Sequence, residues 1–506
     1  MMNFRTQYSR NGCSGRNRRE ARNRKGVIIV LASLLMIFML GLLAFSIDLG
    51  YMMSVQGEMD RAVDCSALAG AGALVDGADE ARLASLDVLL YNSVGSQGIS
   101  EQDSRQAKLY QWLDKHPNDF ETEVGHWNPA TRTFAQNDVL PSAIHVMASY
   151  EHPSTFFARI FGIDSFRVTS EATARYQPRD IALVLDFSGS MNDDSELSYI
   201  NETKRPGSRA AVLGGLQQMY QELGSPAYGS MQFTPVYISS TNATTIKNTL
   251  GLRYKVGKKW VEIPYPYADG SWDDYFSYVQ NSSVVSSAGY YKKYGYLTLI
   301  NYWLEQKPGA DQTADLWKVS AQPVTAVKDA VGVFMDYIQE VDCEDKVALV
   351  IYNSSSGDAY KELSLTTNLS TVEDTVHHRQ AAHYDNYTNI GAGIRKGWEE
   401  LDAHARVGAK KMIVLMTDGN ANRPNGESYG RSYALTQAAN AAAKNYQIVT
   451  ISLGQSADTE LMQEIADATN GVHYNIPGGS AVNDYHDDLI AAFRKIADDR
   501  PLLLVQ

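Results

Sequence analysis

The stretch "DIALVLDFSGSM", Asp180 to Met191, runs from five apolar residues into an aspartate followed by a Ser-Gly-Ser sequence. An apolar run of this kind predicts a strand buried on both faces, as in a parallel sheet covered by helices. Asp186 ends the run, and Ser188 and Ser190 follow it after Phe187. The pattern Asp-x-Ser-x-Ser alone is weak, because a chain of this length contains it by chance about one time in ten. The surrounding sequence therefore decides whether it means a site.

The sequence beyond Arg179 alternates apolar runs with amphipathic segments. Further strands are predicted at "KVALVIYN" (346–353), "KMIVLMTD" (411–418) and "QIVTISLG" (447–454). Amphipathic helices are predicted at 323–341, 389–404 and 433–445. Strands that alternate with helices predict an α/β fold with a doubly wound, mainly parallel sheet over residues 179–506.

A long block, residues 192–320, separates the first predicted strand from the first helix of this pattern. It contains 14 of the 30 tyrosines and short β-prone pieces such as "TPVYISS" and "VEIPYPY". Insertions of this length are usually functional or form a subdomain. Tyrosine suits a recognition surface, but it also suits a small core, and both interpretations stay open.

Two more oxygen-bearing loops are predicted at the same edge of the sheet, because ligands of doubly wound domains bind where the strands end. Thr388 in "YTNIGAGI" precedes a predicted helix, and Asp418 in "LMTDGNAN" ends the third predicted strand. Asp-Phe-Ser-Gly-Ser-Met, Thr-Asn-Ile-Gly and Thr-Asp-Gly together resemble the metal-ion-dependent adhesion site of von Willebrand factor A domains. The resemblance implies a von Willebrand A-like fold and a metal site made by Asp186, Ser188, Ser190, Thr388 and Asp418.

The chemistry of these five side chains follows from their charge. All the donors are hard oxygens, which suit Mg²⁺, Mn²⁺ or Ca²⁺ rather than zinc or copper. Asp186 and Asp418 just neutralise a divalent ion, so the ion can still accept an acidic side chain of a protein ligand. The resemblance further implies that the serines coordinate directly, that Thr388 does so directly or through water, and that one or both aspartates act through water. The alternative is that the serines cap the backbone and Asp418 makes a turn.

The insertion begins at Asn192, two residues after Ser190, and is therefore expected on the metal-bearing face of the sheet. The stretch "NDDSE" (192–196) adds carboxylates there. They would favour a ligand that carries basic residues beside its own acid, or would hold a second cation. We expect the insertion to set which partner fits the site.

An enzymatic function finds little support in the sequence. No histidine lies near the serines in a triad-like arrangement of motifs, and Ser188 has no identifiable base. His383, five residues before Thr388, is a candidate base, but a loop histidine of this kind is more often solvated. We therefore expect a binding protein rather than an enzyme.

The N-terminal 25 residues carry eight basic side chains against Glu20, so the formal net charge of −13 splits into +7 there and −20 beyond. An acidic bulk argues against a nucleic-acid partner. The run "VIIVLASLLMIFMLGLLAFSI" (27–47) has no charge or proline and spans ~31 Å as a helix, which matches a bilayer core. We predict a transmembrane helix over 26–48, uncleaved because the apolar run is longer than the core of a signal peptide and continues into the next segment without a proline.

The arginine-rich flank predicts the orientation of this helix. Arginines on the N-terminal side keep residues 1–25 in the cytoplasm, so a single pass through the inner (cytoplasmic) membrane places the bulk of the chain outside. Of the three cysteines, Cys13 would be inside, and Cys65 and Cys343 would be outside, either paired or free.

Residues 49–178 are predicted as a continued helix followed by a small β-rich region. Small and apolar residues recur at helical spacing from Tyr51 to Leu74, as in a stalk whose small face packs on its own domain. Strands are predicted at "FETEVGHW" (120–127), "SAIHVMASYE" (142–151) and "FRVTSEATARY" (166–176). A long N-terminal helix followed by a small sheet suggests a pilin-like plan.

The segments "RKGVIIVLASLLMIFMLGLLAFSIDLG" and "RAVDCSALAGAGAL" are similar to the N-terminal region of TadG-like proteins of tight-adherence (Flp) pilus assembly. Cys65 and Ser66 stand where alanines are usual, and a downstream von Willebrand A domain is characteristic of the group. Prepilin processing would need a glutamate where Leu31 stands, so we expect an anchored protein rather than a cleaved pilin.

This second resemblance implies a membrane-anchored, metal-dependent protein-binding component of pilus assembly, secretion or adhesion. Its partners would be pilus or envelope proteins. The alternative is a general cell-envelope scaffold or adhesin that uses the A domain and is unrelated to pili.

Overall fold

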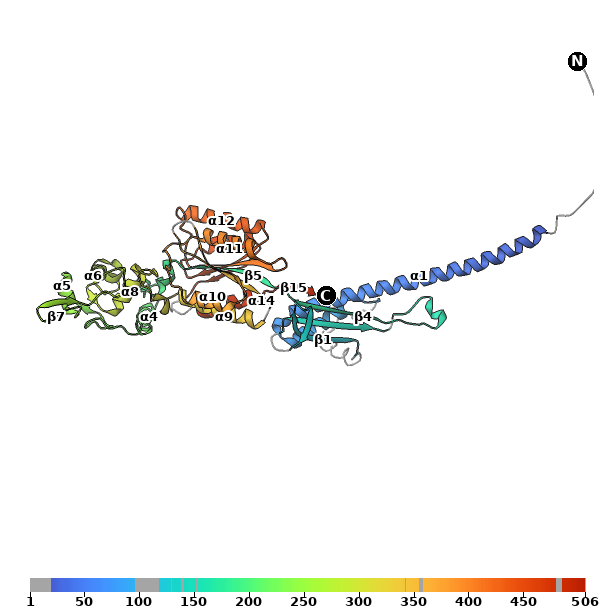
Figure 1. Cartoon of the computed structure of the whole chain (residues 1–506), viewed down its shortest axis with the longest axis horizontal. Helices are drawn as coiled ribbons and strands as arrows, with labels where there is room; N and C mark the ends of the chain where they lie inside the picture. Colours follow the sequence, from blue (N-terminus) through green and yellow to red (C-terminus); the bar gives the residue numbers. More distant parts are fainter. Residues whose placement is uncertain are drawn as a thin grey trace, which may run out of the picture. The chain divides into compact units, whose positions relative to one another are not determined.

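The structure is a computed structural model that describes residues 20–95, 118–128, 130–137, 141–151, 153–341, 343–354, 358–478 and 485–505, apart from the side chains of 20–25. The chain divides into two compact units (Figure 1), Met1–Arg175 with Leu504–Gln506 and Tyr176–Leu503. The predicted boundary between 178 and 179 lies close to this division, but the last residues, predicted in the second unit, belong to the first. The side chains of the predicted cytoplasmic segment, Cys13 included, lie outside the described part.

The first unit is a long helix with a small antiparallel sheet. Its elements are α1 Glu20–Gly72, η1 Leu74–Asp76, α2 Ala78–Tyr91, β1 Phe120–Asn128, β2 Thr133–Gln136, β3 Ala143–Tyr150, η2 Ala158–Phe161, β4 Val168–Tyr176 and β15 Leu502–Val505. The sheet has five strands in the order β15-β4-β3-β1-β2. The three predicted strands are confirmed as β1, β3 and β4, whereas α2, β2 and β15 were not predicted.

α1 has an apolar half and a packed half. Within the described residues it is the one helix long and apolar enough to cross a membrane, and its mean hydropathy reaches 3.0. The large apolar side chains from Val27 to Phe45 are exposed. Val55, Met59 and Val63 are buried, which confirms that this face of the helix packs on its own unit.

Small residues bring α1 close to its neighbours. The hydroxyl of Ser66 donates to the backbone oxygen of Ser85 on α2 at 2.7 Å, and the hydroxyl of Ser85 donates to the backbone oxygen of Ser66 at 3.0 Å. A Cβ atom on Gly70 would lie 2.2 Å from the Ser85 hydroxyl and 2.7 Å from Ile144 on β3. The small residues predicted as a packing face therefore serve as one.

The second unit is built on a six-stranded sheet in the order β11-β10-β5-β12-β13-β14. Its strands are β5 Arg179–Asp186, β10 Lys346–Tyr352, β11 Tyr360–Thr366, β12 Lys410–Thr417, β13 Gln447–Leu453 and β14 His473–Ile476. Only β11 pairs antiparallel among these strands. The four predicted strands are β5, β10, β12 and β13, so the predicted mainly parallel sheet is confirmed.

Helices cover both faces of this sheet. They are α9 Val324–Val341, α10 Leu369–His377, α11 Ile390–His404, α12 Glu427–Ala443, α13 Thr459–Ala468 and α14 His486–Asp498. Figure 1 shows α11 and α12 on one face of the sheet and α9, α10 and α14 on the other. Side chains of α11, α12 and α13 share one core with alternate residues of β5, such as Ala182 and Val184, while Leu183 and Leu185 face α9 and α14.

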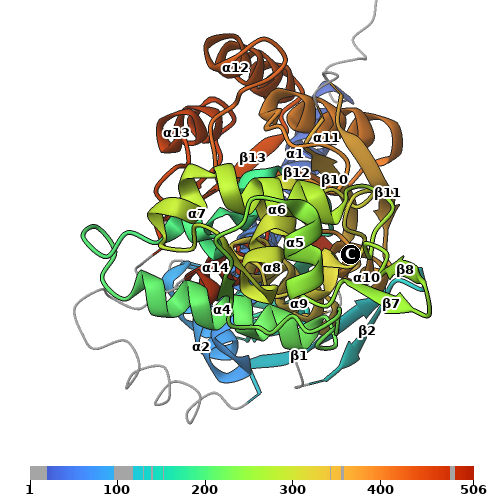
Figure 2. The same cartoon turned by 90° about the vertical axis from the view of Figure 1, so that its left-hand side faces the viewer.

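The insertion contains more helix than strand, and Figure 2 shows it facing the viewer, in front of the sheet. Its elements are η3 Gly189–Ser195, η4 Leu197–Tyr199, α4 Ser208–Glu222, β6 Val236–Tyr237, α5 Ala243–Thr249, β7 Arg253–Val256, β8 Lys259–Glu262, α6 Trp272–Asn281, α7 Ser283–Ser287, β9 Lys293–Tyr294, α8 Tyr296–Gln306 and η5 Leu316–Lys318. Buried tyrosines there are Tyr199, Tyr275, Tyr278, Tyr294, Tyr296 and Tyr302. Tyrosine therefore builds a core here, while Tyr237, Tyr254 and Tyr291 remain exposed.

The two described cysteines are both free thiols. Cys65 is exposed, whereas Cys343 is buried. Burial raises the pKa of Cys343 to about 12, so this side chain stays a protonated, inert thiol. Of the two predicted alternatives, the structure has the free one.

Candidate metal centre

The predicted metal ligands come from three neighbouring elements at one edge of the sheet. β5 pairs in parallel with both β10 and β12, so the carboxyl ends of these strands lie side by side. Asp186 ends β5, and Asp418 follows the last residue of β12. Ser188 and Ser190 lie where the chain turns into η3, and Thr388 lies just before α11.

Hydrogen bonds link four of the five predicted residues. Asp186 accepts the backbone N–H of Ser188 at 2.8 Å. The hydroxyls of Ser188 and Ser190 lie 2.9 Å apart, and the Ser190 hydroxyl donates to Asp418 at 2.7 Å. The second carboxylate oxygen of Asp186 accepts the hydroxyl of Thr417 at 2.7 Å. The two strand ends are thus joined through a series of hydrogen bonds.

Thr388 lies at the edge of this group. Its hydroxyl would lie 3.8 Å from a Cβ atom on Gly419, and the hydroxyl of Ser190 would lie 3.7 Å from the same atom. The backbone N–H of Thr388 donates to the Asn422 side chain at 3.0 Å, and its carbonyl accepts the N–H of Asn422 at 2.9 Å. The structure therefore brings all five predicted residues to one place.

Sequence reasoning missed Thr417 and Asn422, which hydrogen-bond to the predicted ligands Asp186 and Thr388. A polar residue that ends an otherwise apolar strand was a usable signal for Thr417. Asn422 carried no comparable signal, because asparagine in a loop rich in glycine and asparagine usually makes a turn.

The site concentrates negative charge in a buried place. Burial raises the pKa of Asp186 to about 6, although hydrogen bonds from Ser188 and Thr417 oppose the shift. Burial and then the charge of Asp186 raise the pKa of Asp418 well above its usual range. Two buried carboxylates, one of which raises the pKa of the other, call for a counterion.

The donor set fits a hard divalent cation. Two carboxylates and three hydroxyls offer only oxygen, which Mg²⁺, Mn²⁺ and Ca²⁺ prefer. Across the described ranges no group of three or more His, Cys, Asp or Glu side chains could hold a metal, so any ion here would depend on the hydroxyls.

The insertion contributes to the walls of the site, as predicted from its starting point. Ser190 and Asp418 line a cavity of about 40 Å³ together with Asp193 and Asp194. Tyr485 also lines this cavity, and its hydroxyl donates to Asp194. The acidic stretch 192–196 therefore lies beside the predicted ligands.

His383 does not join this group. It is half-buried rather than solvated, and its Nδ1 atom is buried without a hydrogen-bond partner. Burial, and then the positive charge of Arg379, lower its pKa to about 4, so the ring is neutral at physiological pH.

One Gly-x-Ser-x-Gly sequence does occur, Gly426 to Gly430, and sequence reasoning overlooked it. A nucleophile elbow needs a sharp turn between a strand and a helix. Here β12 ends at Thr417, and Ser428 is exposed in the first turn of α12. The sequence therefore lacks the structural context of an elbow.

A glycine on α11 should control the placement of Thr388. A Cβ atom on Gly393 would lie 2.6 Å from the buried ring of Tyr352 and 2.8 Å from Val184. We expect Gly393→Ala to push α11 outward, to cost about 1–3 kcal/mol of unfolding free energy, and to weaken metal binding. Urea unfolding and calorimetric metal titration of the same protein would measure both effects. Gly408→Ala is the control, because its Cβ would meet nothing within 4 Å; an unchanged metal affinity in Gly393→Ala would contradict the expectation.

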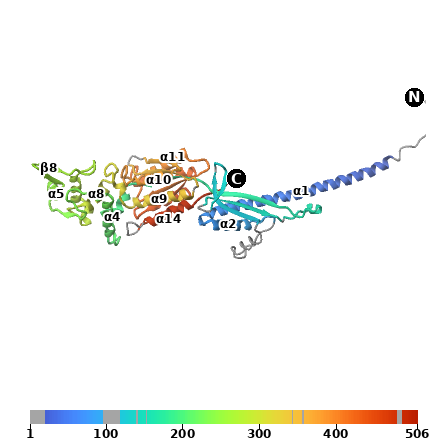
Figure 3. The same cartoon turned by 60° about the horizontal axis from the view of Figure 1, so that its bottom comes forward.

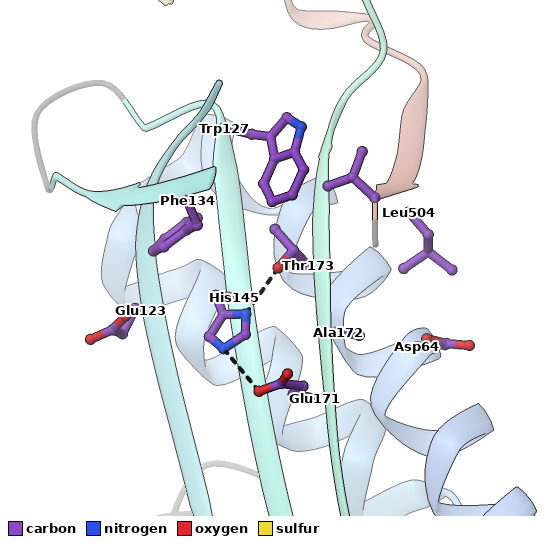
Figure 4. Close-up of a pocket in the computed structure, with 10 residues that line it drawn as sticks. Asp64, Glu123, Trp127, Phe134, His145, Glu171, Ala172, Thr173 and Leu504 are labelled. Atoms are coloured by element: carbon purple, nitrogen blue, oxygen red, sulfur yellow. Dashed lines mark hydrogen bonds and ion pairs between the residues drawn. The ribbon is translucent and has the colours of Figure 1, made fainter. Parts of the chain in front are cut away.

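A larger cavity, of about 490 Å³, lies in the first unit (Figure 4). Trp127 and Phe134 form apolar walls, and Glu171 lies 4.0 Å from the Nε2 atom of His145. The other ring nitrogen of His145 lies 2.9 Å from the hydroxyl of Thr173. The acidic lining disfavours an anionic ligand.

Two regions of the chain match known families. Residues 317–487 match the von Willebrand factor type A domain, and residues 69–174 match the Tad-like Flp pilus-assembly family. Both predicted resemblances are therefore confirmed, and the second unit has a von Willebrand A fold. The first match begins after most of the insertion, so it leaves out β5 and the serines that follow it. No curated protein matches the chain.

Several solved structures resemble parts of the chain. An aerotolerance-related membrane protein from Bacteroides fragilis NCTC 9343 is 17% identical, with 35% of this chain and 88% of that chain covered and a TM-score of 0.28. BatB from Bacteroides thetaiotaomicron is 19% identical, with 35% and 86% covered and a TM-score of 0.27. A von Willebrand factor type A structure from Catenulispora acidiphila is 11% identical, with 75% and 49% covered and a TM-score of 0.29.

Proposed function

We propose that this chain is a membrane-anchored, divalent-metal-dependent protein-binding component of Flp-type pilus assembly, secretion or adhesion. The observation that carries the proposal is the hydrogen-bonded run from Asp186 through Ser188 and Ser190 to Asp418 at adjacent strand ends. The match of residues 69–174 to the Tad-like family favours a pilus partner over a general envelope scaffold.

Each residue of the site has a separate task. Ser188 and Ser190 present hydroxyls from one loop, Thr388 presents one from the start of α11, and Asp186 and Asp418 supply the negative charge. A bound Mg²⁺ or Mn²⁺ would supply an electrophilic position for a carboxylate of the partner. The surrounding acids, Asp193 and Asp194, favour a partner with basic residues beside that carboxylate.

The same residues support binding rather than catalysis. Ser188 and Ser190 hydrogen-bond to one another and to carboxylates, and neither has a hydrogen bond to a histidine within the described part of the chain. A serine nucleophile needs such a base within hydrogen-bond reach. The proposed role of the hydroxyls is therefore ligation.

The apolar half of α1 supports a single-pass anchor in the inner membrane, with the basic N-terminus in the cytoplasm and both units outside. Its large apolar side chains from Val27 to Phe45 are exposed in the described part of the chain, and a bilayer would cover them. The arginine-rich flank supports this orientation.

The proposal can be tested in spheroplasts that carry the full-length chain with an N-terminal affinity tag. A membrane-impermeant cross-linker is added outside, with Mg²⁺ or with EDTA, and partners are captured through the tag. We expect pilus proteins to be captured with Mg²⁺ and lost with EDTA or in Ser190→Ala. Asp402→Asn is the matched control, because Asp402 lies in the last turn of α11, at the other end of the helix from Thr388.

Each negative result of this experiment would contradict a different part of the proposal. Equal capture with EDTA would contradict the metal dependence. Absence of any cross-link to the chain from outside would contradict the orientation. Metal-dependent capture of envelope proteins only, with none from the pilus, would favour the general scaffold.

A further inference from the structure

The connection between β3 and β4 exposes a cluster of apolar side chains. We call residues 156–163 the β3–β4 tip. Its exposed members are Phe156 (52%), Phe157 (38%), Ile160 (76%), Phe161 (84%) and Ile163 (55%). Five large apolar side chains so close together on a loop are unusual for a surface that faces only water.

The β3–β4 tip is an ordered turn rather than a loose loop. Thr155 and Asp164 are joined by a backbone hydrogen bond of 3.1 Å, and Ser154 and Ser165 form an isolated bridge just before them. Gly162 closes η2 with a φ of 84°, a left-handed conformation that glycine adopts without strain. The apolar side chains are therefore held in one arrangement.

α1 fixes the β3–β4 tip at a defined height. The carboxylate of Asp48 accepts the backbone N–H groups of Phe156 at 2.8 Å, Phe157 at 3.0 Å and Ala158 at 2.6 Å. One turn along α1, the ring of Tyr51 lies edge-on to Phe156, with centroids 5.0 Å apart. Three charge-assisted hydrogen bonds to one buried carboxylate make a strong fastening.

The position of Asp48 in the sequence shows where along α1 the β3–β4 tip is attached. Asp48 is the first charged residue after the apolar run 27–47. Figures 1 and 3 both show the β3–β4 connection running beside α1 toward its apolar half. The exposed phenylalanines are thus level with the place where the apolar surface of α1 ends.

We propose that the β3–β4 tip is a second membrane contact, in which Phe157, Ile160 and Phe161 enter the outer interface of the phospholipid bilayer beside α1. This inference rests on the proposed membrane anchor. Apolar and aromatic side chains at this level lie about 5–10 Å into the boundary between headgroups and acyl chains. Arg159 is exposed in the same tip and suits a lipid phosphate.

The bilayer is the occupant that the observations favour. The apolar surface of the β3–β4 tip continues that of α1, so one apolar phase would cover both. A second contact also restrains the tilt of α1, and with it the orientation of the first unit at the membrane. A protein partner or a second copy of the chain would instead shield the tip from lipid as well as from water.

The test uses the full-length chain in phospholipid nanodiscs, in a Cys13→Ser, Cys65→Ser background that retains the buried Cys343. An environment-sensitive fluorophore is attached to Phe161→Cys, to Thr131→Cys on the exposed β1–β2 turn, or to Leu35→Cys within the apolar run. Quenching is measured with nitroxide-labelled lipids and with aqueous iodide. We expect lipid quenching at position 161 to exceed that at 131 by about threefold or more, and iodide quenching to follow the opposite order. Asp48→Ala should reduce the lipid quenching at 161.

The label at position 35 distinguishes failure of the proposed membrane anchor from failure of the proposed membrane contact of the β3–β4 tip. Lipid quenching at 35 but iodide quenching at 161 as strong as at 131 would overturn the second contact and leave the anchor intact. Absence of lipid quenching at 35 would overturn the proposed anchor and this inference with it. Protection of position 161 from both quenchers would mean a protein cover, which also overturns the inference.

Discussion

Asp186→Asn should abolish the stabilisation of the second unit by Mg²⁺ or Mn²⁺ while leaving the metal-free protein at least as stable as the wild type. In the wild type, a metal that binds only the folded state raises the free energy of unfolding by about 2.7 kcal/mol at a hundredfold excess over its Kd. Asparagine removes one of the two charges that the ion needs. Its oxygen can still accept the N–H of Ser188, and its amide can donate to Thr417.

The metal-free protein should tolerate this substitution because the native carboxylate is under electrostatic stress. Burial raises the pKa of Asp186, and burial and then the charge of Asp186 raise the pKa of Asp418. A carboxylate with a raised folded-state pKa opposes folding at pH values above that pKa, so its neutral replacement relieves the fold at neutral pH.

Urea unfolding of the fragment Tyr176–Leu503, with and without metal, measures both quantities. Asp402→Asn is the matched control and should keep the full metal-dependent increment. Asp402 lies in the last turn of α11, at the other end of the helix from Thr388, and it pairs with Lys444. A metal-dependent increment in Asp186→Asn equal to that of the wild type would remove Asp186 from the site.

The grouping of the candidate metal ligands could be predicted from sequence because Asp186 and Asp418 lie directly at strand ends. Apolar runs fix where parallel strands stop, and parallel neighbours must end at the same edge of the sheet. The sequence therefore places Asp186 and Asp418 together, although 231 residues separate Asp186 from Thr417, which donates a hydrogen bond to it. Asn422, which holds Thr388, could not be found in this way, because its position depends on how a loop folds back.

The insertion shows the limit of the same reasoning. Its β-prone pieces predicted extended structure, but "TPVYISS" yields only the two-residue strand β6. Tyr275 on α6 and Tyr296 on α8 are core residues, because aromatic side chains fill a core whichever backbone carries them. Tertiary packing overrode local propensity here.

The first unit was predictable in plan and not in detail. The long helix and three strands followed from periodicity. β15 could not be assigned to this sheet from its own sequence, because its four residues join through a pairing with a strand more than three hundred residues earlier. The β3–β4 tip was missed for a related reason, since its meaning depends on Asp48 more than a hundred residues away.

Asp345→Asn should be the most destabilising single substitution in the second unit, at about 3–5 kcal/mol of unfolding free energy. Asp345 accepts the backbone N–H of Arg179 at 2.8 Å and its guanidinium at 3.0 Å and 2.7 Å. Arg500 lies 3.4 Å from the same carboxylate. All three side chains are buried, so loss of the one negative charge would leave two guanidinium groups without a counterion.

The matched control for this substitution is Asp358→Asn, which changes an exposed carboxylate paired with Arg395 at 3.0 Å and Lys396 at 3.1 Å. Surface ion pairs of this kind contribute about 0–1 kcal/mol, so the control should unfold close to the wild type. A change in Asp345→Asn no larger than that of the control would contradict the prediction.

Arg179 begins β5 and Asp186 ends it, so the two substitutions act on opposite ends of one strand. Asp345→Asn should lower the unfolding free energy yet keep the metal-dependent increment of about 2.7 kcal/mol, because the oxygens of the site are untouched. Asp186→Asn should do the reverse. If Asp345→Asn also lost the increment, metal binding would depend on the stability of the whole sheet, and loss of binding in any one variant could no longer be assigned to a ligand. If Asp345→Asn keeps the metal-dependent increment and Asp186→Asn loses it, metal binding is assigned to the carboxyl end of β5, where Asp186 lies.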